Sequence, residues 1–129
     1  MTASSQRGSS PVEVVFATAV LLLLTLGVME VALALYGRNV VLSSAHEGAR
    51  AAVELGTSSD DAARIATETV RRSAGGLISQ PSVEVTLDEV AGRMHARVNV
   101  SGVLTAFGPI PLRVPLSAEA HASRPATTP

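Results

Sequence analysis

The sequence predicts an α+β fold with a long N-terminal transmembrane helix, a second shorter helix and a small three-stranded antiparallel sheet. Three observations lead to this prediction. An apolar run fills residues 14 to 36, a charged segment with helical spacing fills residues 56 to 76, and apolar and polar residues alternate in three stretches between residues 83 and 122. Repeats near 3.6 residues indicate helices, and repeats of two indicate strands.

The apolar run is long enough to cross a bilayer. From Val14 to Leu35 the only ionisable residue is Glu30, and about 20 apolar residues suffice for a helical span. A carboxylate at the centre of a span costs roughly 3 kcal/mol, but each Leu, Val or Phe returns roughly 0.3 to 0.6 kcal/mol, so insertion is still favoured. Tyr36 and Arg38 fit the membrane interface at the end of the run. A cleaved signal peptide is the alternative, but its apolar core would be shorter, about 7–15 residues.

The first helix is predicted to run beyond the membrane, from about Val12 to Leu55, with Gly56 as its C-cap. Its second half carries apolar and small residues at helical spacing: Val40, Val41, Ser44, Ala45, Gly48, Ala49 and Ala52. Small side chains let helix backbones approach closely, so this face is expected to pack against another helix.

A second helix is predicted between an N-cap at Ser58 or Ser59 and a stop at the glycine pair of residues 75 and 76. Acidic residues lie in its first turn and arginines in its last, as the helix dipole favours. Glu68 and Arg72 form an i, i+4 pair. Its expected apolar face consists of Ala62, Ile65, Ala66, Thr69 and Val70.

Three strands are predicted from strict alternation of apolar and polar residues. Their apolar positions are Val83, Val85 and Leu87, then Met94, Ala96, Val98 and Val100, then Val114, Leu116, Ala118, Ala120 and Ala122. The segment DEVAGR is expected to turn the chain between the first two strands, and FGPIP is expected to be a loop before the third. One face of this antiparallel sheet would be covered by helix and the other exposed.

The composition and the motifs exclude several classes of function. The net charge of -1 provides no basic field for nucleic acid, and the chain has no cysteine for disulfides, thiolate metal sites or nucleophilic catalysis. His46, His95 and His121 fall on a helix and two different strands, without the spacing of a metal motif. No catalytic constellation or phosphate-binding loop is visible. We therefore expect no enzyme activity, no cofactor and no metal.

Several spaced features mark the first part of the chain. Gly8 lies shortly before the apolar run, Glu13 follows five residues later, and Glu30 lies near the end of the run. The residue pair RN then occupies positions 38–39 and the segment EGARA positions 47–51. Over about residues 7 to 52 the sequence resembles the TadE-like family, which are pseudopilin-like proteins of the bacterial tight-adherence (Flp-type) pilus systems. The resemblance implies a pilin-like architecture.

The resemblance also implies that a prepilin peptidase cuts between Gly8 and Ser9. The chain would then divide into a leader at residues 1–8, a transmembrane and extended helix at 9–56, an extracytoplasmic module at 57–123 and a disordered tail at 124–129. Glu13 would neutralise the N-terminal amine of a neighbouring subunit, or would simply be a favourable first-turn acid. Glu30 would contact another subunit or the assembly platform, or would be protonated or reach outward.

The function implied by the resemblance is that of a minor pseudopilin, a structural or assembly component of a tight-adherence type IV pilus. Its partners would be the prepilin peptidase, a related pseudopilin, the major pilin, the pilus assembly platform and membrane lipid, with no nucleic acid. It would cross the cytoplasmic membrane once, with its N-terminus inside and its C-terminus outside, before any incorporation at the cell surface. The alternative is a permanently anchored single-span envelope protein whose outer module binds a partner.

Overall fold

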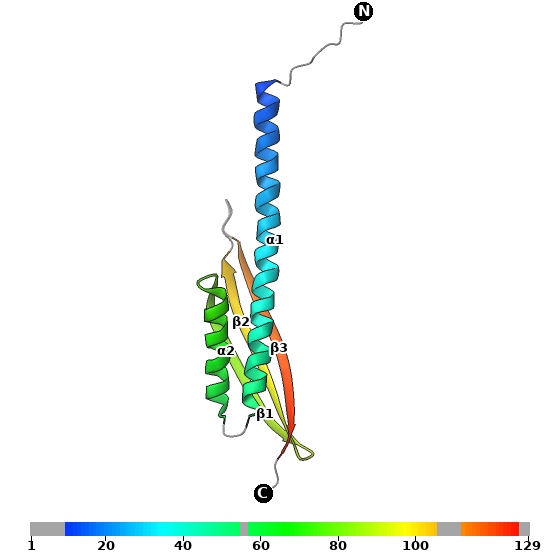
Figure 1. Cartoon of the computed structure of the whole chain (residues 1–129), viewed down its shortest axis with the longest axis vertical. Coiled ribbons are helices and arrows are strands. Elements are labelled where there is room, and N and C mark those ends of the chain that lie inside the picture. The colour runs from blue at the N-terminus through cyan, green and yellow to red at the C-terminus, as the bar shows by residue number, and fades with distance from the viewer. Residues whose placement is uncertain (1–9, 55–56, 106–111, 127–129) are drawn as a thin grey trace, which may run out of the picture.

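The computed structural model describes residues 10–54, 57–105 and 112–126. It confirms the predicted α+β fold. Helix α1 spans Pro11–Ala52 and helix α2 spans Ser59–Ala74, and they are followed by strands β1 (Ile78–Val90), β2 (Arg93–Thr105) and β3 (Arg113–Pro125). Figure 1 shows α1 as a long shaft whose C-terminal half lies beside α2 over one face of the sheet. We call α2, the sheet and this half of α1 the module.

The sheet is an antiparallel meander with the order β1-β2-β3. A two-residue turn at Ala91 and Gly92 joins β1 to β2, and both residues have positive φ angles, of 51° and 71°. Such turns match the right-handed twist of the flanking strands, and glycine adopts this conformation without steric cost. The turn sets a register in which Val85 faces Val98 and Val98 faces Ala120.

The core lies between the two helices and one face of the sheet. All seven residues predicted to form the inner face of α1 beyond the membrane are buried. On the sheet, the completely or almost completely buried residues are Ala96, Val98, Val100, Leu104 and Ala120. On α2 the buried residues are Ala62, Ala66, Val70 and Ala74, whereas Ile65 and Thr69 are only partly buried. The helix expected to pack on α1 is therefore α2 of the same chain.

Glycine at position 48 allows this packing. A β-carbon at Gly48 would lie 2.9 Å from Cβ of Ala66 and 3.2 Å from Cγ1 of Val98. These distances are shorter than ordinary carbon–carbon contacts, which lie at about 3.5–4.0 Å. The two helices and β2 therefore meet at a point where only a hydrogen atom fits.

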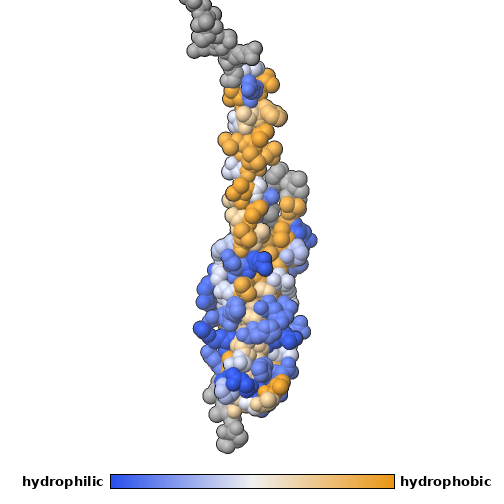
Figure 2. Space-filling model, turned by 90° about the vertical axis from the view of Figure 1, so that its right-hand side faces the viewer, coloured by the Kyte–Doolittle hydropathy of each residue, from blue (hydrophilic) through white to orange (hydrophobic). Residues whose placement is uncertain are grey.

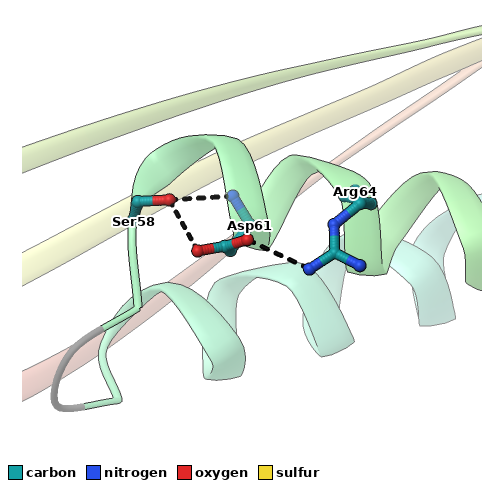
Figure 3. A network of polar contacts seen from close by, with 3 residues as sticks. All are labelled: Ser58, Asp61 and Arg64. Atoms are coloured by element: carbon teal, nitrogen blue, oxygen red, sulfur yellow. Dashed lines mark hydrogen bonds and ion pairs between the residues drawn. The ribbon is translucent and has the colours of Figure 1, made fainter.

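A hydrogen-bonded cap begins α2. The Ser58 hydroxyl accepts a hydrogen bond from the backbone N–H of Asp61 at 3.1 Å and donates one to the Asp61 carboxylate at 2.8 Å. Arg64 donates to the other carboxylate oxygen at 3.0 Å, as Figure 3 shows. Both side-chain hydrogen bonds lower the pKa of Asp61 below its ordinary value of 3.8, and the bond from Ser58 has the larger effect. The structure thus selects Ser58 from the two predicted N-caps.

Several predicted boundaries differ from the structure. Helix α1 ends at Ala52, while Leu55 and Gly56 lie outside the described residues. The strands are longer than the alternation predicted, and most of the DEVAGR segment is strand, with only two turn residues. The whole FGPIP segment, residues 107 to 111, lies outside the described residues, so the predicted loop is not tested.

The prediction of a disordered tail from residue 124 is wrong for Arg124 and Pro125, which belong to β3. Because the tight turn lets β2 begin at Arg93, the second ladder continues until Arg93 faces Pro125. The N–H of Ala126 then donates to the carbonyl of Gly92 at 2.8 Å. Backbone hydrogen bonding therefore extends β3 into a segment where the side chains do not alternate between apolar and polar.

Gly48→Ala is expected to lower the thermal stability of the module. Overpacking costs about 1–3 kcal/mol, whereas alanine gains about 1 kcal/mol over glycine in helix propensity, so the clash should dominate. Gly27→Ala is the matched control, since a β-carbon there meets nothing within 4 Å. Circular dichroism melts of the full chain in detergent would measure both. Equal melting temperatures for the two variants would contradict the close packing at Gly48.

Ser58→Ala is expected to raise the pKa of Asp61 toward its ordinary value and to destabilise α2 by about 1 kcal/mol. Because the pKa is lowered in the folded chain, the linked stabilisation is present above the ordinary value and is lost as pH falls through the lowered one. A carboxyl-carbon NMR titration would measure the change, with Ser59→Ala as the control. An unchanged titration of Asp61 in Ser58→Ala would contradict the assigned cause.

Candidate membrane and assembly surface

The N-terminal half of α1 is an apolar surface that the rest of the described chain leaves uncovered. Phe16 is 70% exposed, Leu21 is 65% exposed and Val28 is 71% exposed. Figure 2 shows hydrophobic residues covering this shaft, while hydrophilic residues dominate the visible face of the module. Among the described residues, α1 is the one helix long and apolar enough to cross a membrane, and its most apolar window is not buried at all. A core helix of a soluble protein would be covered, so these features indicate a single-pass membrane protein.

The length of the apolar run fits a bilayer, and the last turn of the run also contacts the module through Leu33 and Ala34. From Val14 to Tyr36 the helix rises about 33 Å at 1.5 Å per residue, which is close to the hydrocarbon thickness of about 30 Å. The helix then continues without a break into the module. The module is therefore attached through a continuous helix and not through a flexible linker.

Two further contacts fasten the module at the end of the apolar run. The Tyr36 hydroxyl donates a hydrogen bond of 2.6 Å to the carbonyl of Ser73, in the last turn of α2. One residue later, a β-carbon at Gly37 would lie 2.8 Å from Cδ1 of Leu116 on β3. The sequence predicted Tyr36 at the membrane interface but did not predict its hydrogen bond to α2. That bond depends on the antiparallel packing of α2 on α1, which residues close in sequence do not reveal.

Glu13 lies in the first turn of α1 and is exposed. Its N–H donates to the carbonyl of Ser10 at 2.8 Å, and Pro11 occupies the first turn, where it is tolerated. The carboxylate therefore lies at the positive end of the helix dipole. Gly8 and Ser9 lie outside the described residues, so the leader cleavage stays a prediction, as does the pairing of Glu13 with a neighbouring amine.

Glu30 lies about 25 Å further along the same helix at 1.5 Å per residue. It is half-buried, one turn before Leu33 and Ala34, which pack against the core of the module. Within the described part of the chain, no cation lies within ion-pair distance of it. The structure does not bring Glu13 and Glu30 together, and the role of Glu30 stays a prediction.

The histidines form no metal centre within the residues that the structure describes. Arg97 faces His121 across the β2–β3 ladder. Nε2 of His121 lies 2.8 Å from Oε1 of Glu119, and Nε of Arg97 lies 3.5 Å from the same oxygen. These exposed pairs lie on the open, polar face of the sheet and bring no nucleophile or ligand set together.

Residues 8–50 match the TadE-like protein family. This match confirms the resemblance seen in the sequence. The TadE-like segment includes Glu13, Glu30 and nearly all of α1, while α2 and the sheet lie beyond it. The match covers residues 8–50 of the 129 and points to involvement in a Tad pilus system. Searches of curated proteins and of solved structures return no match.

Proposed function

We propose that the protein is a minor pseudopilin-like component of a tight-adherence type IV pilus, processed by prepilin peptidase and assembled through the N-terminal half of α1. The observation that carries the proposal is the division of α1 into a bare apolar half and a half locked into the module. The TadE-like match covers both halves of this helix.

A helix divided in this way can move from lipid into a bundle of similar helices without refolding. Lipid tails and neighbouring apolar helices are equally apolar, so packing, hydrogen bonds and lipid entropy decide between them. The module retains its own core during the transfer, because its packing uses the other half of α1. The protein is thus suited to a structural role in a fibre or in its assembly complex.

Glu13 gives this transfer a polar contact. Cleavage after Gly8 would create an amine at Ser9, and the Glu13 carboxylate would pair with the amine of a neighbouring subunit. In a medium of low dielectric constant this attraction is much larger than in water, although each charge must be desolvated. Glu30 would provide a second contact, to another subunit or to the assembly platform, because an ionisable residue in a membrane helix is costly unless paired.

The proposed location is the cytoplasmic membrane, with the N-terminus inside and the module outside, followed by incorporation at the cell surface or in the pilus. The proposed partners are the prepilin peptidase, a related pseudopilin, the major pilin and the assembly platform. The second candidate function is a permanently anchored envelope protein whose outer module binds a partner. It is favoured by the size of the module outside the TadE-like segment.

Glu13→Ala is expected to reduce the yield of sheared pili by at least about tenfold, since removing one partner of a buried ion pair costs about 3–5 kcal/mol. Glu47→Ala, an exposed acid on the module half of α1, is the matched control and should assemble normally. Intact-mass measurement of the membrane-extracted chain should show loss of residues 1–8, and Gly8→Ala should block that loss.

The two readouts separate the candidate functions. A full-length mass in the wild type would contradict processing and favour the permanently anchored protein. Normal piliation by Glu13→Ala, with correct processing, would contradict the proposed role of its carboxylate.

A further inference from the structure

Exposed arginines gather at the end of the module that borders the bare half of α1. Arg38 follows the apolar run on α1, Arg71 and Arg72 lie in the last turn of α2, and Arg113 begins β3. We call these four residues the arginine rim. They come from three separate elements, so the rim surrounds more than one side of the shaft.

The contacts of the structure place these elements at the end of the module that faces the apolar half of α1. The Tyr36–Ser73 hydrogen bond brings the last turn of α2 beside the end of the apolar run. Leu116 packs at Gly37, and β3 runs in the same direction as α1. Arg113 precedes Leu116 by three residues, which places it about 10 Å closer to the apolar half at about 3.3 Å per residue. Beside it, Leu112 is 47% exposed.

The opposite end of the module is rich in acids. Glu54, Asp60, Asp61, Asp88 and Glu89 lie near the end of α1, the start of α2 and the β1–β2 turn. Arg50, Arg64, Arg93 and Arg124 lie at this end too, so its charges largely balance. At the rim only Arg72 has an acidic partner, Glu68 at 3.7 Å, among the ion pairs of the described residues, so the rim has a local excess of positive charge.

We infer that the arginine rim binds anionic phospholipid headgroups of the leaflet in which the apolar half of α1 ends. The inference rests on the membrane-spanning role of α1 in the proposed function. Guanidinium groups bind phosphate through paired, charge-assisted hydrogen bonds. Basic residues next to a span are attracted to anionic lipid. Contacts from three elements hold the module in one orientation on the bilayer, and assembly into a fibre has to break them.

The test uses the full chain with Leu35→Trp, reconstituted in lipid vesicles. The natural sequence has no tryptophan, and Leu35 is 57% exposed at the level of the rim. Quenching by brominated phosphatidylglycerol and by brominated phosphatidylcholine measures the relative affinity of the adjacent lipid sites. We expect the anionic lipid to be preferred by about fivefold or more at low salt. High salt should reduce the preference.

Three sets of substitutions on the Leu35→Trp chain make the test specific. R71Q/R72Q/R113Q should bring the ratio of affinities close to one. R71K/R72K/R113K should retain most of the preference, because the charge remains. R50Q/R64Q/R93Q removes the same charge from exposed arginines away from the rim and should leave the preference unchanged. Circular dichroism would check that every variant folds.

Two results would overturn the inference in different ways. Equal quenching by both lipids in the Leu35→Trp chain with all four rim arginines present would exclude lipid selection. It would favour an acidic protein partner for these arginines. Weak quenching by either lipid would mean that Leu35→Trp is not in lipid, and the membrane-spanning role itself would then be wrong.

Discussion

The close contact of α1 with α2 and β2 is the constraint on which the rest of the structure depends. Because Gly48 leaves room for Ala66 and Val98, a helix of 42 residues can be half embedded in a small module and half free. The core contains mainly alanine and valine, so its stability depends on short distances more than on large side chains. A bulkier residue at this contact would separate the shaft from the sheet.

The free half of α1 has surface properties that suit two environments. In a bilayer its side chains meet lipid, and in a fibre they would meet other helices with no change in its own backbone. The Tyr36–Ser73 hydrogen bond and the Gly37–Leu116 contact fix the module at the end of the apolar run. A rigid junction of this kind would carry a movement of the shaft directly to the module.

Local patterns predicted most of the fold. Periodicity and capping chemistry predicted the inner face of α1, the cap of α2 and the side chains of each strand that face the core. Both depend on neighbours in sequence. The longer strands and the order at Arg124 depend instead on pairing with β2, and the Tyr36 bond depends on how α2 packs. Glu13 and Glu30 were singled out from the TadE-like pattern, but their proposed partners are other molecules. A single chain therefore leaves their roles as predictions.

The central claim is that α1 is one continuous helix whose bare half lies in lipid. Since the chain has no cysteine, single cysteines carrying spin labels can be placed along α1 in the full chain reconstituted in vesicles. Collision with oxygen and with a water-soluble nickel complex would then be measured at each position. Labels at the exposed positions from residue 16 to 35 should collide more often with oxygen, and labels at Leu42 and Ser43 should collide more often with the nickel complex. Preference for nickel throughout, or a break in helical periodicity near residue 36, would contradict the account.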